Sequence, residues 1–137
     1  MSSTLRNILA VIAGLVIGSI VNMGIIMISS SVIAPPNGAD VTTMEGLKES
    51  LHLFEPKHFL FPFLAHAFGT LVGAIVAVKI AATKKKTMAL VVGCTFLVFG
   101  TINVFVLPGP MWFNTLDVIF AYIPMAILGY KLSNSKV

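Results

Sequence analysis

The sequence predicts an all-α integral membrane protein: a single transmembrane domain over residues 1–137, built as a four-helix transmembrane bundle with a short amphipathic helix on its outer surface. Three observations lead to this class. Hydrophobic residues make up 57% of the chain and charged residues only 10%, a composition outside the range of soluble domains. Four apolar stretches are each long enough to cross a hydrocarbon core, which takes about 20 helical residues. Basic residues are concentrated on one side of these stretches.

The four predicted transmembrane helices cover residues 7–33, 58–82, 87–107 and 115–132. An outer loop of residues 34–57 joins the first two, and short turns join the others. Arg6 precedes the first apolar stretch, as a basic residue does in a signal peptide. That stretch is longer than the apolar region of a signal peptide, which has about 7 to 15 residues, so we expect an uncleaved first helix.

The distribution of charge predicts the orientation of the bundle, because short loops rich in lysine and arginine stay on the cytoplasmic side. The basic residues of one side are Arg6, Lys79, Lys84, Lys85, Lys86, Lys131 and Lys136. The other side holds all five acids, Asp40, Glu45, Glu49, Glu55 and Asp117, with only Lys48 and Lys57. We therefore expect both termini to be cytoplasmic. The basic pI reflects this topology, and no surface typical of nucleic-acid binding is visible, so no nucleic-acid partner is expected.

Small residues recur every fourth position in the first two predicted helices. They are Ala10, Gly14 and Gly18 in the first, and Ala65, Gly69, Gly73 and Ala77 in the second. Membrane helices associate through close backbone approach at such residues. The pattern favours packing of the first helix on the second within one chain, with homodimerisation as the alternative.

The outer side is predicted to carry a surface helix and aromatic anchors. Thr42 and Glu45 have the spacing of a capping box, and a helix is expected from about residue 43 to residue 54, ended by Pro56. Its apolar face consists of Met44, Leu47, Leu51 and Phe54. Trp112 and Phe113, at the other outer turn, are expected at the membrane interface.

Each predicted transmembrane helix carries one strongly polar residue at a similar depth. These residues are Asn22, His66, Asn103 and Asp117. Each lies about 15 or 16 residues from the inner end of its helix, or about 22 to 24 Å, in the outer third of the membrane core. We expect Asp117 to accept a hydrogen bond from His66, and Tyr122 to extend this layer inward. The two helices that supply His66 and Asp117 also contain Pro62 and Pro124, which are expected to kink them.

Other kinds of chemistry find less support in the sequence. His52, Glu55 and His58 form a weak candidate for a metal site, because Pro56 interrupts the helix that would align them. No cofactor motif is present, so no cofactor is expected. The single cysteine, Cys94, lies within the third helix and is interpreted as a packing residue.

Two stretches, FLAHAFGTLVGA at residues 63–74 and AYIPMAILG at residues 121–129, resemble segments of small uncharacterised four-helix bacterial membrane proteins. The resemblance covers parts of the second and fourth helices and implies no activity. It implies a bacterial cytoplasmic (inner) membrane as the location.

For function, the sequence favours a non-enzymatic accessory or partner-binding subunit of the membrane, whose partner is another membrane protein or a second copy of the chain. A second interpretation is binding or transport of a small polar ligand or a proton through an outward-facing pocket at the polar layer. A third is an intramembrane enzyme that uses His66 and Asp117. The lipid bilayer is a partner in all three.

Overall fold

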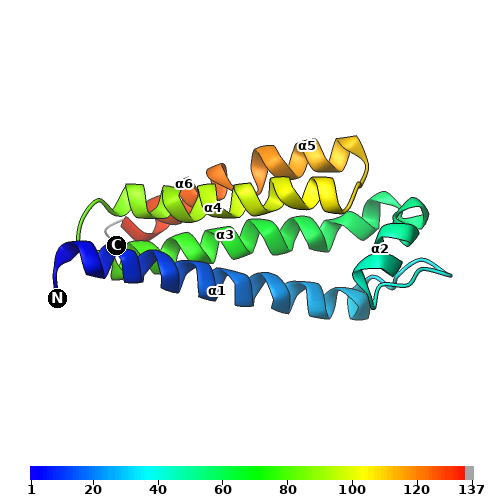
Figure 1. The fold of residues 1–137 in the computed structure, drawn as a ribbon, viewed down its shortest axis with the longest axis horizontal. Coiled ribbons are helices and arrows are strands. Elements are labelled where there is room, and N and C mark those ends of the chain that lie inside the picture. The colour runs from blue at the N-terminus through cyan, green and yellow to red at the C-terminus, as the bar shows by residue number, and fades with distance from the viewer. Residues whose placement is uncertain (135–137) are drawn as a thin grey trace.

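Helices account for most of residues 1–134, the part of the chain that this computed structural model describes, and no strand occurs within it. The helices are α1 (Ser3–Val32), α2 (Met44–Ser50), α3 (Leu60–Ile80), α4 (Lys85–Val106), α5 (Met111–Phe120) and α6 (Ile123–Asn134). Two 3-10 turns, η1 (Leu51–Leu53) and η2 (Pro56–Phe59), lie between α2 and α3. The start of α1 and the end of α6 lie at one end of an elongated bundle, and α2 lies at the other (Figure 1). Lys136, one of the basic residues used to predict orientation, falls outside the described residues.

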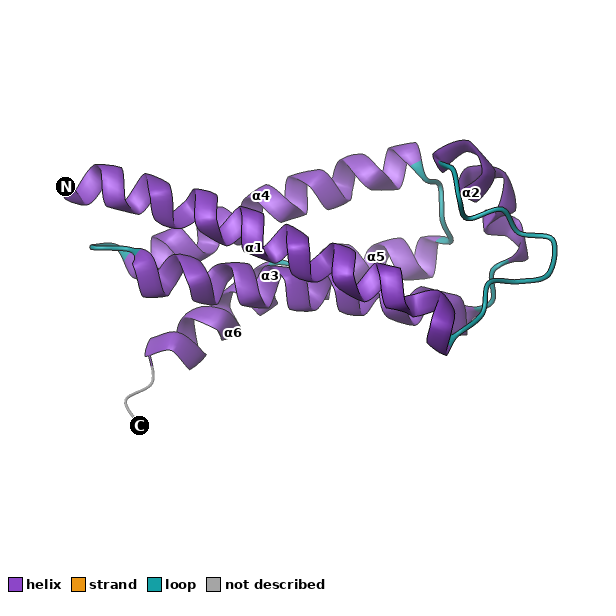
Figure 2. Ribbon diagram, turned by 90° about the horizontal axis from the view of Figure 1, so that it is seen from below, coloured by secondary structure: helices purple, strands orange, loops and turns teal. Residues whose placement is uncertain are grey.

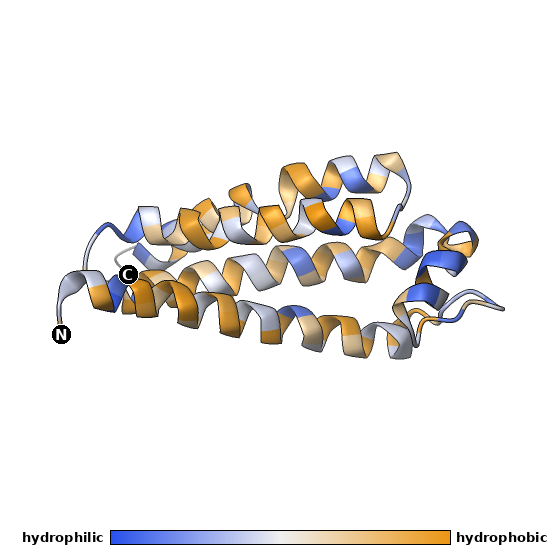
Figure 3. Cartoon of the chain, viewed as in Figure 1, coloured by the Kyte–Doolittle hydropathy of each residue, from blue (hydrophilic) through white to orange (hydrophobic). Residues whose placement is uncertain are grey.

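Four helical segments are long and apolar enough to cross a membrane, as predicted. They are Ser3–Val32, Pro56–Ile80, Lys85–Val106 and Met111–Asn134. The last begins at residue 111 rather than 115, because helix α5 starts directly after Pro110, which precedes its first turn. Hydrophobic colour runs along the long helices, while hydrophilic colour gathers around α2 and recurs at a few places within the helices (Figure 3).

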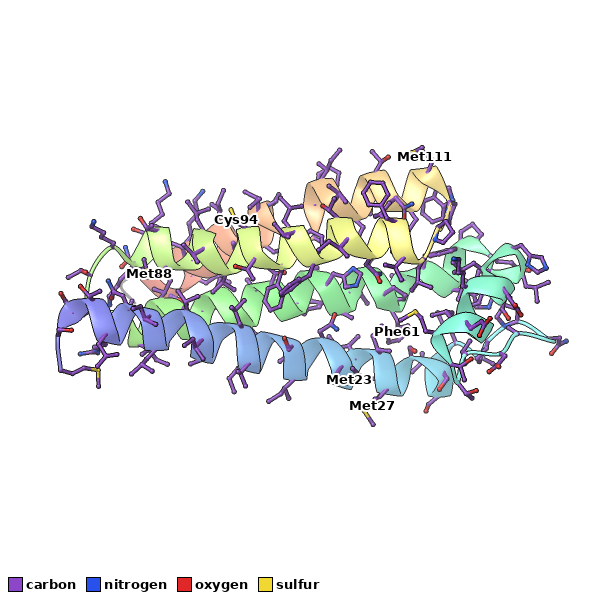
Figure 4. The ribbon with its side chains drawn as sticks, viewed as in Figure 1. Met23, Met27, Phe61, Met88, Cys94 and Met111 are labelled. Atoms are coloured by element: carbon purple, nitrogen blue, oxygen red, sulfur yellow. The ribbon has the colours of Figure 1, made fainter. Side chains whose placement is uncertain are left out.

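The outward face of α1 is almost entirely apolar. Among its large side chains, Ile20, Met23 and Met27 are 61%, 56% and 72% exposed. The side chains of Met23 and Met27 extend away from the bundle (Figure 4). An apolar surface of this extent is typical of helices that face lipid.

Helix α1 packs on α3 through the small residues that the sequence singled out. A Cβ atom added to Gly14 would lie 2.5 Å from the backbone oxygen of Gly73, and one added to Gly18 would lie 2.6 Å from that of Gly69. The two backbones therefore touch without intervening side chains. The small-residue faces of α1 and α3 thus meet within one chain.

Hydrogen bonds also join the start of α1 to the end of α3 and the turn that follows it. The Asn7 side-chain oxygen accepts hydrogen bonds from the backbone N–H groups of Ala82 and Thr83, and its amide donates to the Thr83 hydroxyl. Arg6 donates to the carbonyl of Ile80. These bonds satisfy backbone groups where α3 ends, which would otherwise lack partners.

The short helix α2 lies over the end of the bundle, but its capping differs from the prediction. The N-cap is Thr43, whose hydroxyl accepts a hydrogen bond from the backbone N–H of Gly46. The predicted capping box between Thr42 and Glu45 is therefore wrong, because the cap lies one residue later. The hydroxyl and the backbone N–H of Thr42 both donate hydrogen bonds to the carboxylate of Asp40. These bonds, the hydroxyl bond more strongly than the N–H bond, lower the pKa of Asp40 below its ordinary value. The helix predicted over residues 43–54 is α-helical only to Ser50 and is followed by the 3-10 turn η1 to Leu53. Pro56, predicted to end this helix, begins η2 instead.

The two prolines have different effects on their helices. Pro124 has no N–H to donate to the carbonyl of Phe120, and the fourth transmembrane segment is broken at residues 121–122 into α5 and α6. Pro62 occupies the third position of α3, just after the 3-10 turn η2, where the backbone nitrogen needs no partner within the α-helix. The predicted kink at Pro62 is therefore wrong: Pro62 lies in the first turn of α3, directly after the change from the 3-10 turn η2 to the α-helix.

An aromatic cluster surrounds the start of α5. The Phe113 ring lies 4.7 Å from that of Phe59, and the Trp112 ring lies 5.6 Å from that of Phe59. Trp112 is 49% exposed, in keeping with an interface anchor, but Phe113 is only 9% exposed and belongs to the core. The prediction for Phe113 is therefore replaced by a packing role.

Candidate functional site

A histidine–aspartate pair lies in the interior of the bundle, in the half nearer α2. The Nδ1 atom of His66, on α3, lies 2.8 Å from Oδ1 and 3.0 Å from Oδ2 of Asp117, on α5. Asp117 is 4% exposed, and the His66 side chain is 22% exposed. The carboxylate is thus removed from solvent and depends on side-chain partners for its hydrogen bonds.

Tyr122 completes this group from the break between α5 and α6. Its hydroxyl donates to Oδ2 of Asp117 at 3.0 Å, and its ring stacks with the His66 ring at a centroid distance of 5.8 Å. Gly100 makes this position possible, because a Cβ atom there would collide with the Tyr122 hydroxyl. The structure therefore joins three of the five predicted site residues into one hydrogen-bonded group.

The contact with Asp117 assigns a role to each nitrogen of the His66 ring. Two carboxylate oxygens face Nδ1, so this atom carries the proton and donates it. In the neutral ring, Nε2 then holds a lone pair and acts as an acceptor. No hydrogen bond to Nε2 is formed within residues 1–134.

A cavity of about 210 Å³ lies beside this group, between α1, α3 and α4. Its polar lining residues are Ser19, Asn22, His66, Thr70, Asn103 and Tyr122. The predicted residues Asn22 and Asn103 thus share a cavity with His66, but their side chains make no hydrogen bond to another residue of the described chain. The hydrogen-bonding capacity of both amides is free for a molecule in the cavity.

A second cavity, of about 170 Å³, lies under α2 and adjoins the first. Both are lined by His66, Gly100 and Asn103. Three of the four residues of the predicted apolar face, Leu47, Leu51 and Phe54, line the second cavity and cover the mouth of the bundle. The fourth, Met44, is 58% exposed and lines neither cavity.

The first cavity reaches the flank of the bundle. Ser19 and Asn103, which line it from α1 and α4, are both exposed. These two helices diverge toward the end that carries α2 (Figure 2). The first cavity is therefore open on the flank between α1 and α4.

Sequence reasoning missed three residues that shape the site: Ser19, Thr70 and Gly100. Ser19 precedes Asn22 by three positions, Thr70 follows His66 by four, and Gly100 precedes Asn103 by three. These spacings place each residue on the same helical face as a residue that was predicted. Thr70 donates to the backbone carbonyl of His66 and is 1% exposed, so it supports the helix next to the ring.

The weak metal candidate is not assembled as a site. The Nδ1 atom of His58 accepts from the backbone N–H of Glu55, and Nδ1 of His52 contacts the carbonyl of Glu49. Within residues 1–134, no group of three or more histidine, cysteine or acidic residues is placed to hold a metal ion. These residues instead organise the turns between α2 and α3.

Comparisons with protein-family models, curated proteins and solved structures give no match for this chain. The interpretation of the site therefore rests on its own geometry. That geometry combines a buried acid–base pair with a cavity lined by free amides. The pair has the arrangement of a base and its orienting carboxylate, but no serine, threonine or cysteine side chain of residues 1–134 is hydrogen-bonded to the His66 ring.

Proposed function

We propose that this chain is a small integral membrane protein that reversibly binds a small polar molecule in the cavity beside His66, without a covalent step. One observation carries the proposal. The Asn22 and Asn103 amides and the Nε2 atom of His66 belong to residues that line one cavity, and none of these groups has a hydrogen-bond partner within residues 1–134. The cavity of about 210 Å³ exceeds the space of a single water molecule.

These polar groups lie among apolar side chains of α1 and α4. Polar side chains at membrane depth are costly when they lack hydrogen bonds, and they commonly mark ligand or ion sites. Most other residues at this level of α1 and α4 are apolar and exposed, such as Ile20, Met23, Val98 and Phe99. A bound molecule with complementary donors and acceptors would satisfy the free amides, and the cost of leaving them without hydrogen bonds at membrane depth would be offset.

We further propose that the chain lies in a bacterial cytoplasmic membrane with both termini in the cytoplasm. The uneven distribution of lysine and arginine supports this orientation. In a Cys94→Ala background, Glu49→Cys in α2 is expected to react with a membrane-impermeant maleimide on intact cells. Lys85→Cys is expected to react only after the cells are permeabilised, and the reverse pattern would refute the orientation.

The binding proposal is tested by thermal unfolding of the purified protein in mild detergent with three small probes: isobutylamine, isobutanol and isobutyramide. At least one probe is expected to raise the Tm of the wild type in a saturable manner, because a ligand that binds only the folded state stabilises it. Asn103→Leu is expected to abolish the shift. This variant removes a cavity amide without breaking a side-chain hydrogen bond.

Thr101→Leu provides the matched control on the same helix. Thr101 is exposed, lies outside both cavities and bonds only within its own helix, so this variant is expected to keep the full shift. An equal shift in both variants would mean that the probes act on the detergent or elsewhere on the protein, and the proposed site would be rejected.

A second candidate function is that of an accessory subunit in a membrane complex. The exposed polar residues Ser19 and Asn103 on the flank between α1 and α4 favour it, because a partner helix would satisfy the same groups. The same variants separate the two candidates. Failure of all three probes, together with loss of a stoichiometric membrane partner on Asn103→Leu but not on Thr101→Leu, would favour the subunit.

A further inference from the structure

We infer that the ligand of this cavity is a small protonated amine, held beside His66 by hydrogen-bond acceptors and aromatic rings. The inference rests on the proposed function and specifies the chemical class of the molecule. Three properties of the site support it: the sign of its charge, the direction of its free hydrogen bonds and the nature of its apolar walls.

The charge of the site excludes anions. Among the described residues, no lysine or arginine lines either of the two adjoining cavities. The buried carboxylate of Asp117 is the one acidic group among their lining residues, and its companions are the ring of His66 and the hydroxyl of Tyr122. An anionic ligand would be repelled by this carboxylate in a medium of low dielectric constant, whereas a cation would be attracted.

The free hydrogen-bonding groups are suited to a donor. Since Nδ1 of His66 donates to Asp117, Nε2 of the neutral ring offers a lone pair. The side-chain oxygens of Asn22 and Asn103 are further acceptors on the same cavity. An ammonium group has three donors and no acceptor, so it matches these three positions in number and in kind.

The apolar part of the wall also favours a cation. Phe96, Phe99 and Tyr122 line the cavity, and the faces of such rings attract ammonium groups when water is excluded. Both oxygens of Asp117 are already engaged by His66 and Tyr122. The carboxylate therefore acts on the ligand through space and through the polarised imidazole, and the rings and amides make the direct contacts.

Three molecules of similar shape and different charge test the inference at neutral pH: isobutylamine as the cation, isobutanol as the neutral molecule and isobutyrate as the anion. Titrations of the Tm give an apparent Kd for each. Isobutylamine is expected to bind at least about tenfold more tightly than isobutanol, a difference of about 1.4 kcal/mol, and isobutyrate is expected to bind most weakly. Preferred binding of isobutanol or isobutyrate would overturn the inference.

The outcomes keep this inference separate from the proposed function. If isobutanol binds, its binding is lost in Asn103→Leu, and isobutylamine binds no more tightly than isobutanol, then the site exists and the inferred ligand class is wrong. If none of the probes shifts the wild type, the proposed function itself fails.

Asp117→Asn, in which the side chain keeps its size but loses its charge, gives an independent check. It is expected to reduce the preference for isobutylamine over isobutanol to within about threefold, whatever the affinity of the variant for isobutanol itself. Should this variant be too unstable to titrate, the comparison of the three probes on the wild-type protein still decides the question.

Discussion

Gly14→Val is expected to lower the free energy of unfolding by about 2 to 3 kcal/mol, in the upper part of the range for overpacked cores. The nearest neighbours of an added Cβ are the backbone oxygen of Gly73 at 2.5 Å, a Val92 methyl group at 3.1 Å and the Ala77 Cβ at 3.2 Å. A backbone oxygen cannot rotate away as a side chain does, so α1 must separate from α3. The buried residues of α1 are Ala10, Gly14 and Gly18, and this separation would remove most of its packing.

Gly24→Val is the matched control on the same helix, because a Cβ atom at Gly24 would meet nothing within 4 Å. Thermal and denaturant unfolding in mild detergent, followed by circular dichroism, would measure both variants. Gly24→Val is expected to stay within about 0.5 kcal/mol of the wild type, as most surface substitutions do. Equal stability of the two variants would show that α1 is not held by close backbone contact.

Asp117→Ala is expected to lower the free energy of unfolding by about 3 to 5 kcal/mol, because each of two interior donors loses its acceptor at a cost of about 1 to 3 kcal/mol. Asp117 is 4% exposed, and its carboxylate accepts from both His66 and Tyr122. Its removal leaves two donors without an acceptor in the interior and also leaves space where the carboxylate was. Thermal unfolding of the purified variant at neutral pH is the measurement.

Two further variants are expected to lose less unfolding free energy than Asp117→Ala. Tyr122→Phe removes one donor and is expected to cost about 1 kcal/mol, while Asp117→Asn retains an acceptor and is expected to fall between Tyr122→Phe and Asp117→Ala. A gain in stability for Asp117→Asn would contradict this order. It would mean that the carboxylate is held at a cost to the fold, as charged groups at binding and catalytic sites often are.

The sequence was sufficient to predict the four long helices and the contact between α1 and α3. Helix length is set by the thickness of the membrane core, and small residues at every fourth position leave few alternatives for the face that packs. The position of the surface helix was also predicted. Its cap was assigned to Thr42 rather than Thr43, because adjacent threonines offer the same hydroxyl and only the three-dimensional course of the loop decides between them.

The candidate site was predicted in part. The pairing of His66 with Asp117 followed from depth and hydrogen-bonding chemistry, which the structure reproduces as a contact. The position of Tyr122 depends on the break between α5 and α6, and its contact with Asp117 spans only five residues of chain. The cavity itself was not predictable, because it depends on how far α1 and α4 diverge and on which side chains fill the space between them.

The break at residues 121–122 has a mechanical consequence for the acid–base pair. The inner half of the last segment is fixed, since Gly129 packs directly on Ala74 and a Cβ there would lie 2.9 Å from the Ala74 Cβ. Asp117 belongs to the outer half, α5, whereas His66 belongs to α3. A pivot of α5 about the break would change the distance between carboxylate and imidazole while the rest of the bundle stayed in place. Such a pivot would change the ring contact between Phe113 and Phe59 together with the hydrogen bond between His66 and Asp117, so packing near α2 and the position of the shared proton would be linked.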